Sequence, residues 1–246
     1  MKTYLHAFFM CQSMFCAIPA PQVWDERARD KMLLFLPIVG LELGLLWWGL
    51  SYICRMLPPL MAALILSVYP YFATGFLHLD GFMDVTDALR SYRSLERRRE
   101  ILKDSHVGCF AVIGIVILLL SQFVCFASMK GTADCRVLLF IPAVSRCCSA
   151  LAVTALKPMS TSQYAAQEKP KSHVVVLLVM VSFFLLGGFL LCGKTATALL
   201  GVLSGYGFAL CAGYRSLEGM NGDIAGYALS IGELCGAAVI ALGGIL

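Results

Sequence analysis

Three aspartates, Asp80, Asp84 and Asp87, stand four and then three residues apart in a polar stretch between two long apolar runs. On an α-helix, at about 100° per residue, they fall within roughly 60° of one another, so their carboxylates share one face. Three like charges on one face repel one another unless a cation lies among them. Because Mg²⁺ prefers a few carboxylates together with phosphate oxygens and water, the spacing predicts a magnesium site. The alternative is a solvated acidic turn at a helix end.

Further polar groups follow the aspartates along the same stretch. Ser94 can cap a short helix over Leu95–Lys103, and Lys103 and Asp104 come at its end. Asp104 brings a fourth carboxylate, which can complete a metal cage or position a substrate hydroxyl, and Lys103 can hold a phosphate oxygen. The arginines at 97–99 can instead anchor the chain at anionic lipid head groups.

The composition is that of an integral membrane protein. Of 246 residues, 59% are hydrophobic and 14% are charged, the net charge is +4, and the mean hydropathy is +0.81. A soluble domain carries about 25% charged residues. We therefore expect an all-α fold, a polytopic helical bundle that forms a single integral membrane domain over 1–246. The 11 cysteines are scattered and indicate neither a disulfide framework nor a metal site.

The long apolar runs predict about seven transmembrane helices, because each run can cross a hydrocarbon core of about 30 Å. These spans are Met32–Cys54, Leu60–Leu79, Gly108–Ser128, Cys135–Leu156, Val174–Cys192, Thr195–Gly213 and Tyr227–Leu246. The N-terminal segment Tyr4–Ile18 is apolar but short, and Pro19 and Pro21 follow it without a clear signal-peptide cleavage site. We expect a short interfacial or re-entrant helix there, and a full transmembrane span is the alternative.

The basic residues predict the orientation, because they gather on the cytoplasmic side of membrane proteins. Span parity assigns one side Arg27, Arg29, Lys31, Arg90, Arg93, Arg97, Arg98, Arg99, Lys103, Lys157, Lys169, Lys171 and Arg215. The other side receives only Arg55, Lys130, Arg136 and Lys194. The richer side should be cytoplasmic, in the inner membrane of the cell. The acidic stretch and the late loop after Arg215 then face the same compartment.

Charges inside the apolar runs are costly in lipid, so they should face a polar cavity or a partner of opposite charge. Arg146 can bind an anionic phosphate or form an ion pair with Glu42. Glu233 lies within the last run and is a candidate for the same reason. The glycine-rich turn around Asn221 and Asp223 can offer backbone N–H groups to a phosphate, although such turns also simply join helices.

Together these motifs resemble the cobalamin synthase family, the adenosylcobinamide-GDP ribazoletransferases. The matching segments, in chain order, are WDERARDKMLLFLPIVGLELG, HLDGFMDVTDALRS, ILKDSHVG, AVSR and GMNGDIAGYALSIGE. Members usually have Asp-Thr-x-Asp-Gly where this chain has Asp84-Val85-Thr86-Asp87-Ala88. The carboxylates are kept, so the resemblance extends to the groups that would do the chemistry.

The resemblance implies a Mg²⁺-dependent transferase that joins adenosylcobinamide-GDP to α-ribazole, or its 5′-phosphate, and releases GMP at the cytoplasmic face of the membrane. Asp80, Asp84 and Asp87 would hold the metal, and either Asp87 or Asp104 would accept the hydroxyl proton. All four aspartates are expected to be catalytic. Substrate contacts are expected from His78, Gly81, Lys103, Ser105, Arg146, Asn221, Asp223 and Glu233.

Two other kinds of membrane protein share parts of the pattern. CDP-alcohol phosphotransferases also bind metal through aspartates, but Asp80-Gly81 lacks the preceding acid of their Asp-x-x-Asp-Gly motif. A transporter could use Arg146, Glu42 and Glu233 at the membrane midplane, but it gives no reason for three aspartates at the edge. We expect the two substrates and membrane lipid as partners, and no nucleic acid. A homo-oligomer and a complex with other enzymes of the pathway are both compatible with the sequence.

Overall fold

The computed structural model describes residues 2–129, 133–160, 162 and 170–243, and their regular structure is helical. The elements are α1 (Lys2–Phe15), η1 (Glu26–Phe35), α2 (Leu36–Cys54), α3 (Pro59–Ala73), α4 (Leu77–Arg90), α5 (Leu95–Ile101), α6 (Cys109–Ala127), α7 (Val137–Ala155), α8 (Lys171–Cys192), η2 (Gly193–Ala196), α9 (Thr197–Leu217) and α10 (Gly222–Gly243). An isolated parallel β-bridge joins Pro158 to Met220. The expected all-α fold is confirmed.

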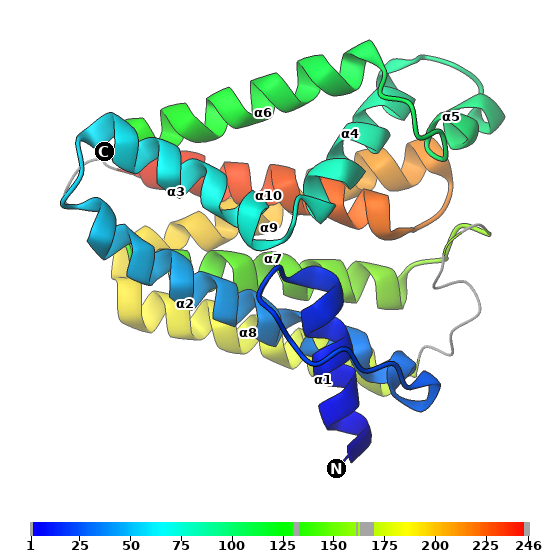
Figure 1. The fold of residues 1–246 in the computed structure, drawn as a ribbon, viewed down its shortest axis with the longest axis horizontal. Helices are drawn as coiled ribbons and strands as arrows, with labels where there is room; N and C mark the ends of the chain where they lie inside the picture. Colours follow the sequence, from blue (N-terminus) through cyan, green and yellow to red (C-terminus); the bar gives the residue numbers. More distant parts are fainter. Residues whose placement is uncertain (1, 130–132, 161, 163–169, 244–246) are drawn as a thin grey trace.

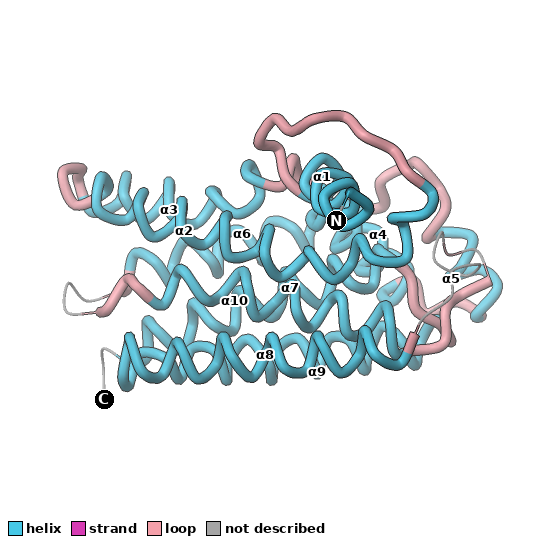
Figure 2. Tube along the Cα trace, turned by 90° about the horizontal axis from the view of Figure 1, so that it is seen from below, coloured by secondary structure: helices cyan, strands magenta, loops and turns pink. Residues whose placement is uncertain are grey.

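The long helices lie roughly along one axis, with α7 and α10 in the middle of the bundle (Figures 1 and 2). In the most apolar stretches of α7 and α10, 78% and 67% of the residues are buried, against 22% in α6. The outer helices therefore present apolar side chains outward, as expected of helices that face lipid rather than water. The chain is a multi-pass membrane protein.

Five helical stretches in the described part of the chain are long and apolar enough to cross a membrane. They are Glu26–Cys54, Cys109–Ala127, Val137–Ala155, Lys171–Leu217 and Gly222–Gly243, and α3 with α4 makes a sixth if that bent pair is one span. The stretch Lys171–Leu217 contains two helices, α8 and α9, and the chain reverses direction between them at η2 (Figure 1). The expectation of about seven spans counted these two helices separately.

One expected span, Leu60–Leu79, is not a single helix. It is divided between α3 and α4, whose axes meet at 89°. Gly75 and Phe76 at the corner both have positive φ angles, +58° and +63°, and a right-handed helix cannot continue through them. The bend turns the acidic helix α4 out of line with α3 and lays it against α10.

The N-terminal helix α1 crosses the long helices instead of running beside them (Figure 1). It has 14 residues, or about 21 Å at 1.5 Å per residue, which is too short for a hydrocarbon core of about 30 Å. It packs on η1 through the rings of Phe8 and Phe35, whose centroids are 5.9 Å apart. His6 Nδ1 also lies within hydrogen-bond distance of Asp25 Oδ2, at 2.8 Å, just before η1. This geometry agrees with the expected short helix.

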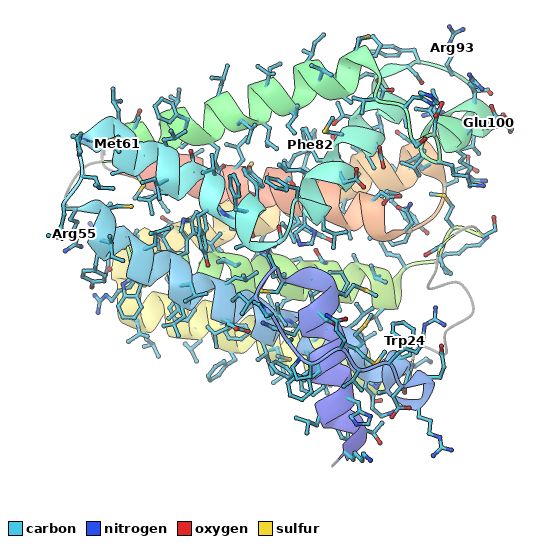
Figure 3. The ribbon with its side chains drawn as sticks, in the orientation of Figure 1. Trp24, Arg55, Met61, Phe82, Arg93 and Glu100 are labelled. Carbon is cyan, nitrogen blue, oxygen red and sulfur yellow. The ribbon has the colours of Figure 1, made fainter. Side chains whose placement is uncertain are left out.

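The two ends of the bundle carry different loops. Arg93 and Glu100 lie at the end that holds α5, and Arg55 and Met61 lie at the opposite end (Figure 3). This division agrees with the span parity used to separate the basic residues. Lys130, Lys169 and the end of the last expected span lie outside the described residues.

Candidate active site

The acidic helix α4 buries one face and keeps its aspartates on another. His78, Leu79, Gly81, Phe82, Val85 and Ala88 are its buried residues. Phe82 stacks on Tyr227 of α10 with ring centroids 5.6 Å apart, which fixes the buried face against α10. Asp80, Asp84 and Asp87 all line one cavity of about 300 Å³. The expected common face for the three carboxylates is confirmed.

The segment after α5 forms the opposite wall of this cavity, which we call the acidic cavity. Ser94 caps α5, as expected, by accepting a hydrogen bond from the backbone N–H of Arg97. Lys103, Asp104 and Ser105 then line the acidic cavity together with the aspartates of α4. The site therefore combines four carboxylates with one ammonium group, all from the stretch that the sequence singled out.

Asp104 is exposed and stays ionised at neutral pH. The backbone N–H of His106 donates to Asp104 Oδ1 at 3.0 Å, and Nδ1 of the same histidine lies 2.7 Å from that oxygen. These hydrogen bonds hold the pKa of Asp104 below its usual value. A carboxylate with a lowered pKa is a poor proton acceptor, so Asp104 suits a binding role better than that of a general base.

A fifth aspartate approaches α4 from the start of α10. The position of a Cβ atom on Gly81 lies 2.8 Å from Asp223 Cα and 2.9 Å from its carbonyl oxygen, so only glycine lets the two helices come this close. Gly81 thus has a packing position, buried between the helices. Its contact brings Asp223 beside the aspartates of α4.

The carboxylates of this site repel one another. Asp80, Asp223 and Asp87 all lie close enough to Asp84 for their charges to act on it. Among the described residues, however, no three Asp, Glu, His or Cys side chains already surround a single metal position. The arrangement suits a cation held by one or two carboxylates that takes its other oxygen ligands from a phosphate and water, which is the usual mode for Mg²⁺.

Two sets of contacts fix the turn before α10. The Asn221 side chain accepts a hydrogen bond from the backbone N–H of Ile224 at 3.0 Å and donates to Asp223 Oδ2 at 2.6 Å. Arg99 of α5 donates to the carbonyl oxygens of Leu217 at 2.9 Å and of Glu218 at 3.1 Å, at the end of α9. Asn221 therefore orients Asp223, and Arg99 ties α5 to the end of α9.

Comparison with known proteins bears directly on this site. A family model described as cobalamin-5-phosphate synthase matches residues 7–241. The chain belongs to the cobalamin-5-phosphate synthase family. The acidic cavity, the turn before α10 and the central helices all lie within the matched range.

Curated relatives in this family align with nearly the full length of this chain. An adenosylcobinamide-GDP ribazoletransferase of Clostridium perfringens is 39% identical, with 98% of this chain and 100% of the relative covered. Proteins of the same name from Lachnoclostridium phytofermentans and Pseudomonas putida are 31% and 34% identical, covering 99% and 92% of this chain and 96% and 91% of each relative. No solved structure matches the chain.

The charged residues inside the membrane have partners other than those expected from the sequence. Arg146 of α7 does not pair with Glu42: its Nη1 lies 2.5 Å from Oε1 of Glu233 on α10. Ser145 Oγ donates to the same carboxylate oxygen at 2.8 Å. Arg146 is 1% exposed and Glu233 is 2% exposed, and neither lines the acidic cavity. The two residues expected to bind substrate are thus placed as a buried ion pair between the central helices.

Sequence reasoning missed Arg99 and the N-terminal segment. Arg99 and its neighbours share the pattern of a lipid anchor, and nothing in a run of arginines shows which one turns inward. His78, expected to contact substrate, is 8% exposed and lines a second cavity whose walls include residues of α1. The local pattern near the N-terminus predicts a helix but does not indicate what that helix covers.

The close contact at Gly81 leads to a first prediction. Gly81→Ala places a methyl group against the backbone of Asp223, which cannot move as a side chain can. We expect a loss of about 1–3 kcal/mol in the free energy of unfolding and reduced transfer activity, because α4 must shift away from α10. Thermal unfolding in detergent measures the first effect. Gly49→Ala is the control: apart from the neighbouring backbone of its own helix, no atom lies within 4 Å of that Cβ position, so the change should be neutral or slightly stabilising. Equal effects at both positions would contradict the packing role of Gly81.

Proposed function

We propose that this chain joins adenosylcobinamide-GDP to α-ribazole, or to its 5′-phosphate, and releases GMP. The family match and the names of full-length relatives support this activity. The observation in the structure that carries the proposal is the acidic cavity, in which three aspartates of α4 face Lys103 and Asp104. Such a set of groups can hold a diphosphate and neutralise the charge that develops during its cleavage.

In this reaction a hydroxyl oxygen of the ribazole ribose forms a bond to the phosphorus attached to cobinamide. The bond from that phosphorus to the oxygen of the GMP group breaks, and GMP leaves with that oxygen. The hydroxyl proton passes to a carboxylate. Asp87 is the better candidate acceptor, since the pKa of Asp104 is lowered by its hydrogen bonds. The ammonium group of Lys103 holds a phosphate oxygen at the mouth of the acidic cavity.

We assign Mg²⁺ to the aspartates of α4. One or two of Asp80, Asp84 and Asp87 would hold the ion, which would supply positive charge against the diphosphate oxygens. Asp223, placed at the same cluster by Gly81, is a further oxygen donor to the ion or its water ligands. The repulsion among these carboxylates is the physical reason for a cation here.

We further propose that this site faces the cytoplasm. The end of the bundle that holds α5 carries Arg93 and the basic run after it, and the opposite end carries Arg55 (Figure 3). Basic residues concentrate on the cytoplasmic side of membrane proteins. The acidic cavity is lined by residues of α4 and of the segment after α5, at the basic end.

A second prediction tests the reaction itself. The purified chain in detergent, given adenosylcobinamide-GDP, α-ribazole and Mg²⁺, should release one GMP for each corrinoid product formed. Chelation of the metal should stop the release, and added Mg²⁺ should restore it. GMP release that does not depend on ribazole would show a hydrolase, and corrinoid transfer without a divalent cation would refute the assignment of Mg²⁺.

A further inference from the structure

A second cavity, of about 230 Å³, lies beside the acidic cavity, and Asp80 lines both. We call it the apolar cavity, because most of its lining is hydrocarbon: Phe15, Leu33, Leu36 and Val153 are among its walls. All four of these side chains are at most 9% exposed. The two cavities differ in chemistry and meet at Asp80, and Asp223 also lines the apolar cavity.

The walls of the apolar cavity come from distant parts of the chain. Phe15 ends α1, Leu33 and Leu36 lie at the junction of η1 and α2, and Val153 lies on α7. The backbone N–H of Ala17 donates to the carbonyl of Ala73 at 2.8 Å, which ties the end of α1 to the corner between α3 and α4. Figure 1 shows α1 lying across the long helices. The N-terminal segment therefore closes one side of the cavity.

The apolar cavity also holds a polar group that lacks a partner. His78 lines it and is 8% exposed, and within the described residues its Nε2 atom makes no hydrogen bond. A buried polar atom without a partner is unfavourable, so such an atom at a cavity indicates that a bound molecule supplies the missing contact. The ligand should therefore be mainly apolar and carry at least one hydrogen-bonding atom.

We propose that the apolar cavity binds the flat aromatic base of the nucleoside substrate, with its ribose directed past Asp80 into the acidic cavity. This inference rests on the proposed function, in which a ribose hydroxyl attacks a diphosphate. A benzimidazole-type base has an apolar bicyclic body and a ring nitrogen that can pair with His78. The cavity volume lies below the range of about 300–1,000 Å³ that is usual for drug-sized ligands, so it suits a bicyclic base and not a corrin macrocycle.

The first test changes the size of the apolar cavity. Val153→Ala enlarges it and Val153→Leu fills it, while Val144→Ala and Val144→Leu make the same changes at a buried position of α7 that lines neither cavity. The readout is the ratio of kcat/KM for ribosides of dimethylbenzimidazole and of benzimidazole. We expect Val153→Leu to favour the smaller base by about tenfold or more, since one methylene in an apolar pocket is worth about 10–200-fold. Val153→Ala should shift the ratio in the opposite direction.

Two further readouts separate this inference from the proposed function. The KM for adenosylcobinamide-GDP should stay within about twofold of the wild type in both Val153 variants. His78→Leu should weaken α-ribazole binding by about tenfold. The change in fluorescence of the benzimidazole, in detergent solution without the corrinoid, measures this binding. The inference is overturned if GMP release proceeds normally but base preference is unchanged in the Val153 variants, or changes equally in the Val144 variants. Absence of GMP release in the wild type would overturn the proposed function and this inference together.

Discussion

Asp84→Asn is expected to lower the rate of GMP release by at least about a hundredfold while the protein stays folded and inserted in the membrane. Asparagine has nearly the same shape, but it removes the charge that faces the metal and the diphosphate. Loss of one group that stabilises developing charge typically costs a factor of about 10²–10³ in rate. Because Asp80, Asp87 and Asp223 act on Asp84 as like charges, the variant loses repulsion and should be no less stable than the wild type in the absence of metal.

The matched control for this experiment is Asp134→Asn. Asp134 forms an exposed ion pair with Arg136 at 2.6 Å, just before α7 and away from the acidic cavity. An exposed pair contributes about 0–1 kcal/mol, so this variant should remain folded and fully active. An Asp84→Asn protein with more than about a tenth of wild-type activity would remove the charge argument. Equal loss in both variants would trace the effect to expression or insertion.

The second large effect is expected at the buried ion pair. Arg146→Met leaves the carboxylate of Glu233 buried without its guanidinium partner, and breaking such a pair costs about 3–5 kcal/mol. We expect most of the protein to be unfolded or degraded. The double variant Arg146→Met, Glu233→Leu removes both charges and fills the space with hydrocarbon, so it should recover most of the lost stability. Denaturation in mixed micelles measures the three free energies of unfolding.

The activity of the double variant distinguishes two roles for Arg146. If the pair only joins α7 to α10, the refolded double variant should keep substantial GMP release. A double variant that is stable but inactive would return Arg146 and Glu233 to the substrate-binding role that the sequence predicted for them. The structure favours the first outcome, because both side chains are almost fully buried and neither lines the acidic cavity.

The acidic face of α4 and the cap of α5 could be predicted from the sequence because they depend on local spacing. Residues at i, i+4 and i+7 must share a helix face, and Ser94 must precede the helix that it caps. The placement of Lys103 and Asp104 opposite the aspartates follows from the short connection between them. Where chemistry lies within one short segment, the pattern of residue types determines most of the geometry.

The contacts between distant segments could not be predicted in this way. The sequence offered Glu42 or a phosphate as the partner of Arg146, and only the packing of α7 against α10 brings Glu233 to it. The bend at Gly75 and Phe76 requires two left-handed residues in a run that reads as continuous hydrocarbon. Without that bend, α4 would not lie against α10, and Asp223 would not approach the aspartates.

The most direct test of the account is a titration of Mn²⁺ against the protein in detergent with GDP present, following the loss of the free-ion signal by electron paramagnetic resonance. Mn²⁺ replaces Mg²⁺ at oxygen-ligand sites and reports its own binding. Saturable binding is expected for the wild type and for Asp134→Asn, and an affinity at least about tenfold lower is expected for Asp84→Asn. Equal affinities in the wild type and Asp84→Asn, or no saturable binding in the wild type, would contradict a cation site on the acidic face of α4.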